Sequence, residues 1–143
     1  MTIILIVVFL IWIYSYFKFR RKYKYFLVMT EYLKHELLIN QENVYTASNV
    51  MLRLSSAFIE IQHYKDAYEV YETLMKTNLP NIDKSRLKEN MDFCSNPFPG
   101  SNGLKNHNGS FWHNFILVRL GKRRFNFLTE EDFLQTNSII RNM

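Results

Sequence analysis

Hydrophobic residues form one uninterrupted segment at the start of the chain. Residues 1–17 carry no charged side chain, and Ile, Val, Leu and Phe would cover every face of a helix formed there. Such a helix would be about 26 Å long at about 1.5 Å per residue, slightly short for a hydrocarbon core of about 30 Å. Because Lys18 can extend its ammonium group toward the interface, the span can include Phe19. The pattern predicts a transmembrane anchor over residues 1–19.

The helical period continues beyond this segment. Residues 26–40 repeat apolar side chains at intervals of three or four positions, which is typical of a helix with one buried face. No helix-breaking residue lies between Lys18 and Phe26. We therefore expect the anchor to continue as one long helix to about Leu38.

Two more amphipathic segments follow, residues 49–62 and 64–78, and Pro80 ends the second. Because only a residue or two joins them, we expect them to pack antiparallel as a helical hairpin. One hairpin cannot bury its own apolar face. Residues 26–40 and 82–93 are therefore expected to pack on either side of it.

This hairpin resembles a single tetratricopeptide repeat. The positions that carry the resemblance are Met51, Leu54-Ser55, Phe58, Ala67, Tyr71 and Pro80. The nine-residue step from Phe58 to Ala67 fits the family pattern, whereas Met51 replaces its aromatic residue and Ser55 its glycine. The other interpretation of residues 49–80 is an ordinary αα-hairpin.

The resemblance implies a binding function, because such repeats bind peptides or partner helices along a concave face. If this carries over, the candidate partner contacts are the tyrosines at helical spacing on the second helix, Tyr64, Tyr68 and Tyr71. The other interpretation of these three rings is that they belong to the core.

The C-terminal part is less regular. Residues 94–110 are rich in Asn, Gly, Pro and Ser, which predicts a loop or linker. Residues 111–128 fit a β-hairpin that turns at Gly121-Lys122, and the alternative is a helix that ends at Gly121. Thr129 is expected to cap a last helix that runs to about Arg141, because three acidic residues follow it and suit a helix N-terminus.

The predicted fold class is therefore mainly α, with a possible C-terminal β-hairpin. The predicted parts are an anchor (1–19), a basic juxtamembrane segment (20–25), a helical domain (26–93), a linker (94–110) and a C-terminal hairpin or helix followed by the last helix (111–143).

The net charge of +5 comes from one short block, Lys18, Arg20, Arg21, Lys22 and Lys24, since the remaining 13 Lys and Arg residues balance 13 Asp and Glu residues. The block lies on the C-terminal side of the span, so the positive-inside rule predicts that Met1 faces outside and the rest of the chain is cytoplasmic. The membrane-interface residues are the block itself together with Trp12, Tyr14 and Tyr16, which form an expected aromatic belt.

Three alternatives compete with a membrane anchor. A cleaved signal peptide would need basic residues before the apolar segment and a small-residue cleavage site, and neither is present. A buried core helix would have to be covered on every face. A nucleic-acid patch would need a longer basic stripe than this block offers, so no nucleic-acid partner is expected.

Catalytic motifs are not evident. Cys94 is the single cysteine, so no disulfide can form within the chain. Cys94, His107 and His113 could meet at a zinc ion, but their spacing matches no ligand pattern and no fourth ligand is evident. No phosphate-binding loop or hydrolase motif occurs. We predict no catalytic residue, metal or cofactor, and no enzyme activity.

The predicted function is that of a single-pass membrane protein whose small cytoplasmic helical module binds another protein or a second copy of the chain. One alternative is a small membrane-bound enzyme or metal-binding subunit that uses residues 94–113. A further alternative is a nucleic-acid binder that uses the basic segment.

Overall fold

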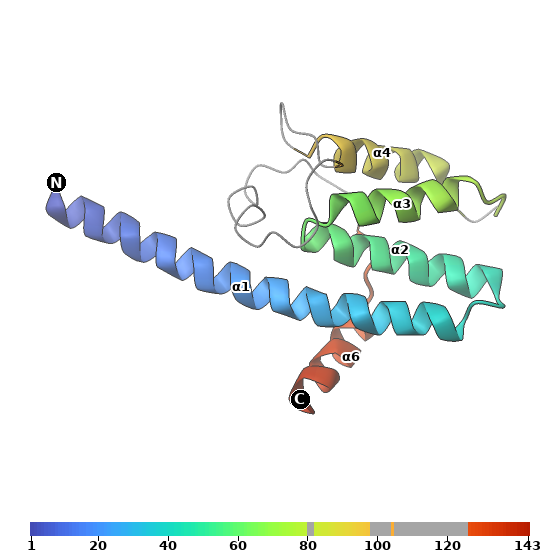
Figure 1. Ribbon diagram of the computed structural model, residues 1–143, viewed down its shortest axis with the longest axis horizontal. Coiled ribbons are helices and arrows are strands. Elements are labelled where there is room, and N and C mark those ends of the chain that lie inside the picture. Colours follow the sequence, from blue (N-terminus) through green and yellow to red (C-terminus); the bar gives the residue numbers. More distant parts are fainter. Residues whose placement is uncertain (80–81, 98–103, 105–125) are drawn as a thin grey trace.

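The computed structural model describes residues 1–79, 82–97, 104 and 126–143. In these residues the chain is mainly α-helical, and it forms five helices and no strand. The helices are α1 (Thr2–Ile39), α2 (Val44–Glu60), α3 (Tyr64–Met75), α4 (Lys84–Ser95) and α6 (Glu130–Arg141). Figure 1 shows α1 to α4 stacked in chain order, each antiparallel to the one before, with α6 on the far side of α1 from α3 and α4.

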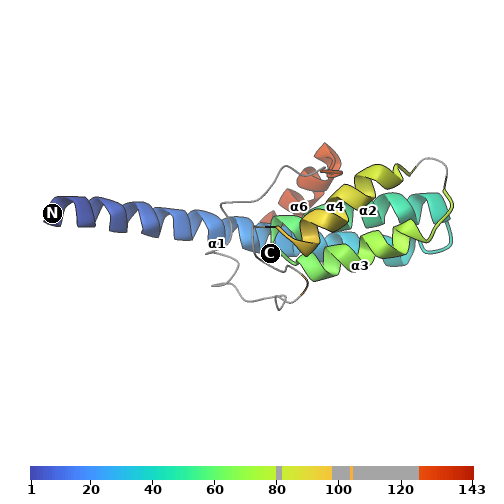
Figure 2. The ribbon, with the colours of Figure 1, turned by 90° about the horizontal axis from the view of Figure 1, so that it is seen from above.

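The long N-terminal helix is confirmed as one continuous element of 38 residues, about 57 Å long at about 1.5 Å per residue. Its N-terminal half projects away from the other helices (Figures 1 and 2). The buried face of α1 begins only at Phe19 and continues through Tyr23, Phe26, Met29 and Leu33 at steps of three or four residues. This stripe packs against α2, so one helix has both an exposed apolar half and a packed half.

Helix α2 begins at Val44, five residues before the predicted start at residue 49. The side chain of Asn43 accepts a hydrogen bond from the backbone N–H of Thr46 at 3.2 Å and caps the helix. The predicted end at residue 62 is also late, because α2 stops at Glu60 and Gln62 lies in the left-handed region at φ 60°. The chain then turns directly into α3, which confirms the predicted antiparallel hairpin.

The next two helices are shifted slightly from their expected bounds. Helix α3 ends at Met75, before the predicted residue 78. Helix α4 starts at Lys84, because the side chain of Asp83 accepts hydrogen bonds from the backbone N–H groups of Ser85 and Arg86 at 3.0 and 3.3 Å. It continues to Ser95, so the first two residues of the predicted linker 94–110 are helical.

The predicted β-hairpin over residues 111–128 is not supported. Residues 111–125 lie outside the described part of the chain, and residues 126–128 are not in a strand. Their backbone groups bond elsewhere, since the N–H of Phe127 donates to Ser56 Oγ at 2.9 Å and the N–H of Leu128 donates to Asn126 Oδ1 at 2.9 Å. The last helix is confirmed with its predicted bounds and its Thr129 cap.

Candidate functional site

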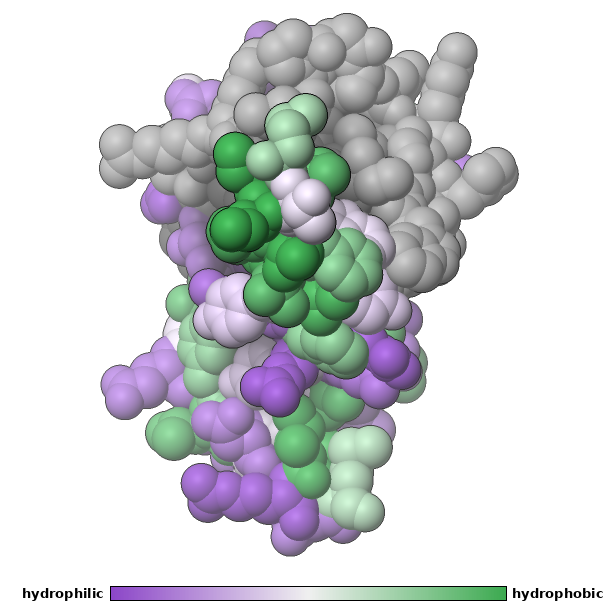
Figure 3. Space-filling model, turned by 90° about the vertical axis from the view of Figure 1, so that its left-hand side faces the viewer, coloured by the Kyte–Doolittle hydropathy of each residue, from purple (hydrophilic) through white to green (hydrophobic). Residues whose placement is uncertain are grey.

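The exposed half of α1 is the first candidate site. Among the described residues, α1 is the one helix that is long and apolar enough to cross a membrane. Its large apolar side chains from Ile3 to Ile11 are 49–78% exposed, and Figure 3 shows them as a hydrophobic projection toward the viewer. Because they do not pack on the other helices, the alternative of a buried core helix does not fit this structure.

The expected aromatic belt lies along α1 at helical spacing. Trp12 stacks on Tyr16 with ring centroids 6.2 Å apart, and Trp12 and Tyr14 are 48% and 67% exposed. Amphipathic rings in such positions are typical of a membrane–water interface. Their contact with lipid stays a prediction.

The basic block is part of the packed helix and not a separate linker. Lys18, Arg20, Arg21, Lys22 and Lys24 are exposed, whereas Phe19 and Tyr23 between them are buried. Lys22 Nζ lies 2.8 Å from Glu60 Oε2, and the hydroxyl of Tyr23 lies 3.1 Å from Nε2 of His63. The helical module therefore begins directly where the apolar half ends.

The candidate tyrosines of α3 lie mostly in the core. Tyr64 packs edge-on against Phe93 of α4 with centroids 5.7 Å apart. The hydroxyl of Tyr71 accepts a hydrogen bond from Asn90 Nδ2 at 3.0 Å, and burial raises the pKa of Tyr71 to about 12. Since α4 covers both rings, only the half-buried Tyr68 keeps part of its surface. A partner role for the three tyrosines stays a prediction, and it requires exposure that Tyr64 and Tyr71 lack here.

The structure instead forms a groove over α2 between α1 and α3, which we call the α1–α3 groove. Its volume is about 300 Å³, and it is lined by Lys34, Met51, Phe58, Asp66, Glu69, Val70 and Thr73. Lys34 Nζ lies 5.6 Å from the ring centroid of Phe58. Asp66 and Glu69 of α3 form one wall of this groove because α1 lies opposite them.

His63 joins three helices near this groove. Its ring stacks on Phe58 with centroids 6.2 Å apart, and Nδ1 lies 3.5 Å from Asp66 Oδ2. Burial lowers the pKa of His63, while the carboxylate of Asp66 raises it and the charge of Lys34 lowers it further. The contacts hold the N-terminus of α3 against α1 and α2.

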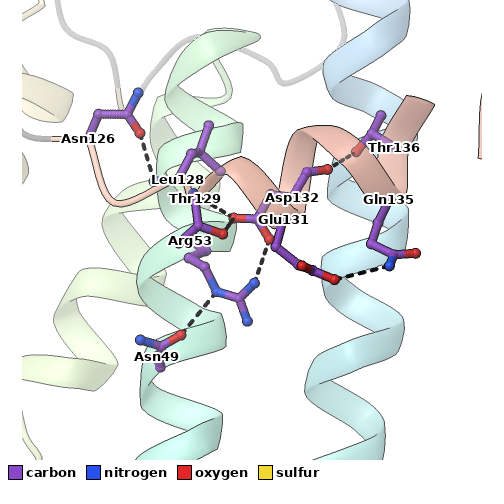
Figure 4. A network of polar contacts seen from close by, with 9 residues as sticks. All are labelled: Asn49, Arg53, Asn126, Leu128, Thr129, Glu131, Asp132, Gln135 and Thr136. Carbon is purple, nitrogen blue, oxygen red and sulfur yellow. Dashed lines mark hydrogen bonds and ion pairs between the residues drawn. The ribbon is translucent and has the colours of Figure 1, made fainter. Parts of the chain in front are cut away.

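A second polar cluster attaches α6 to the other helices (Figure 4). Asp132 is fully buried, and its Oδ1 pairs with Nη1 of Arg53 on α2. Asp132 Oδ2 accepts hydrogen bonds from the backbone N–H and the hydroxyl of Thr129 at 2.9 and 3.1 Å. Asn49 Oδ1 in turn accepts a hydrogen bond from Arg53 Nε at 3.0 Å.

No group of three or more His, Cys, Asp and Glu side chains that could hold a metal ion occurs in the described part of the chain. Cys94 is buried at the end of α4, and His107 and His113 lie outside the described residues.

No protein family matches this chain, and no curated protein or solved structure is significantly similar to it. The function is therefore inferred from the residues and the geometry alone.

Proposed function

We propose that this protein is a single-pass membrane protein whose helical module faces the cytoplasm and binds another protein. The observation that supports the proposal best is the division of α1 into two halves. The N-terminal half is apolar and exposed, and the half that begins at Phe19 packs into the module. A water-soluble protein would leave this apolar surface in water at a large free-energy cost.

The basic block supports the proposed orientation. Lys18 to Lys24 lie at the module's end of the apolar half, which is the cytoplasmic side under the positive-inside rule. Removal of the apolar half as a signal peptide would cut α1 close to Phe19, the first buried residue of its packed face. A stable anchor keeps this helix whole.

The α1–α3 groove supports the binding role. An apolar floor of Met51 and Phe58, with Lys34 over the Phe58 ring, lies beside the carboxylates of Asp66 and Glu69. This combination suits a partner segment that presents an apolar side chain next to a cation. The stacking of α1 to α3 and the resemblance to a tetratricopeptide repeat favour the same use of this face.

The anchor and its orientation can be tested with one cysteine. Cys94 is buried and gives little background, so Glu42→Cys places a reactive thiol in the exposed α1–α2 turn. We expect the chain to stay in alkali-washed membranes and residue 42 to react with an impermeant maleimide only after permeabilisation. Reaction of residue 42 in intact cells would show that the module faces outside and not the cytoplasm. Loss of the chain from the membranes on alkaline washing would refute the anchor.

The groove can be tested by photo-crosslinking. A crosslinking residue at Thr73, in the groove wall, should form a defined adduct in membranes that contain the full chain. Glu69→Lys should abolish the adduct, whereas Glu72→Lys, an equal charge change on the exposed face of α3, should not. If the adduct forms equally well in Glu69→Lys and in Glu72→Lys, the binding role of the groove is contradicted.

A further inference from the structure

Helix α6 is fixed to α1 at its N-terminal end and free at the other. Phe133 stacks on Tyr25 with centroids 6.3 Å apart and meets Phe26 edge-on at the same distance. The hydroxyl of Tyr25 also donates to the carbonyl of Phe133 at 3.2 Å. Beyond this contact α6 diverges from α1, and its C-terminus points back toward the side on which the apolar half of α1 projects (Figure 1).

The free end of α6 is apolar and basic. Ile139, Ile140 and Met143 are 37%, 39% and 87% exposed, and Arg141 lies among them in the last turn. The acidic residues of α6, Glu130, Glu131 and Asp132, all lie in its first turn, at the other end of the helix. Apolar side chains beside basic ones are typical of protein surfaces that bind anionic membrane interfaces.

A cleft of about 360 Å³ separates this end of α6 from the basic block. It is lined by Arg21, Lys24, Tyr25 and Val28 of α1 and by Ile140 and Met143 of α6. Within the described residues, Lys22 pairs with Glu60, but no carboxylate lies within ion-pair distance of Arg21 or Lys24. The two cations of the cleft are therefore available for an external anion.

In a membrane-spanning α1, the two cations of the cleft would lie close to the level of the lipid headgroups. Arg21 and Lys24 lie three and six residues beyond Lys18, which corresponds to about 4.5 and 9 Å along the helix. The polar layer of a bilayer adds about 5–7 Å on each side of the hydrocarbon core. Because side chains lean toward the N-terminus of their helix, both cations point back toward that layer.

We propose that the cleft between α1 and α6 binds the headgroup of an anionic phospholipid from the bilayer that holds α1. The phosphate contacts Arg21 and Lys24, and Ile140 and Met143 of α6 line the other side of the cleft that holds it. This contact is a second attachment to the membrane beside the anchor, and it rests on the proposed membrane function. It fixes the face that the module turns to the bilayer.

The test uses the full chain in vesicles of neutral phosphatidylcholine, with and without anionic phosphatidylglycerol. Met143→Cys carries an environment-sensitive fluorophore, and Glu130→Cys, at the opposite end of α6, is the matched control position. We expect the emission at residue 143 to shift to shorter wavelength only in anionic vesicles, with no shift at residue 130.

The cations are tested by Arg21→Gln with Lys24→Gln, which leaves three basic residues of the block in place. Two charges correspond to a roughly thirty-fold weaker docking equilibrium, or about 2 kcal/mol. The shift should be lost in this variant and kept in Lys84→Gln with Lys88→Gln, which removes two exposed cations from α4.

The outcomes separate the two proposals. Absence of a shift in a chain that survives an alkaline wash would overturn the lipid site and leave the anchor standing. An equal shift in neutral and anionic vesicles would also overturn it, because burial by a protein copy or a neutral surface needs no cation. Loss of the chain from washed vesicles would refute the anchor and the lipid site together.

Discussion

Replacement of Asp132 should release α6 from a module that otherwise stays folded. The carboxylate is fully buried, pairs with Arg53, and caps the start of α6 through Thr129. In Asp132→Ala, Arg53 loses its ion-pair partner but keeps its hydrogen bond to Asn49, and the N–H of Thr129 loses its acceptor. None of these groups holds the packing between α1, α2, α3 and α4.

The expected cost follows from burial. Breaking a buried ion pair costs about 3–5 kcal/mol, and the lower value applies here because the side chain of Arg53 keeps 14% of its surface and can turn toward water. About 3 kcal/mol corresponds to a roughly 150-fold increase in the opening of α6. Only local stability should change.

Hydrogen exchange of the full chain in detergent measures this opening helix by helix. The amides of α6 should exchange roughly 150-fold faster in Asp132→Ala, while those of α2 and α3 keep their protection. Glu131→Ala is the matched control, since Glu131 is exposed and its carboxylate contacts only Gln135 of the same helix in the described residues. Similar exchange of α6 in the two variants would refute the role of the buried pair.

Two further predictions concern pH. Burial lowers the pKa of His63 below its ordinary 6.5, so the unfolded chain takes up a proton first as the pH falls and stability is lost below about pH 6.5. Thermal unfolding should show this loss in the wild type and less of it in His63→Gln. If the melting temperature falls equally with decreasing pH in both proteins, His63 is not the group responsible. Burial raises the pKa of Tyr71 to about 12 from 10.0, so the unfolded chain ionises first and stability falls as the pH rises from about 10 to 12. Tyr71→Phe should lack that alkaline loss and cost about 1–3 kcal/mol at neutral pH by leaving Asn90 without this bond, and an unchanged alkaline slope would count against it.

The sequence predicts those features that depend on neighbouring residues. The continuity of α1 follows from an apolar segment and a helical period with no breaker between them. The start of α6 follows from Thr129 and the acidic residues after it. The early start of α2 depends on the Asn43 cap, whereas the apolar period from which the helix is predicted becomes clear only several residues later.

Features that depend on distant residues could not be predicted in this way. Arg53 and Asp132 are 79 positions apart, and no local pattern pairs them. The groove wall of Asp66 and Glu69 exists only because α1 brings Lys34 to the opposite side, and no local pattern indicates this. The pattern of α3 identified Tyr64 and Tyr71 correctly as one stripe, but the position of α4 decides that this stripe is covered.

The absence of a hinge in α1 has a mechanical consequence. Neither glycine nor proline occurs before Pro80, so the exposed apolar half and the packed half of α1 move as one rigid lever. From Phe19 to Ile39 this lever is about 30 Å long, and a tilt of about 20°, usual for a membrane helix, displaces its far end sideways by about 10 Å. In the proposed membrane protein, any event that changes the tilt of α1 in the bilayer would be transmitted to the α1–α3 groove as a change of height and direction, with no change in the groove itself.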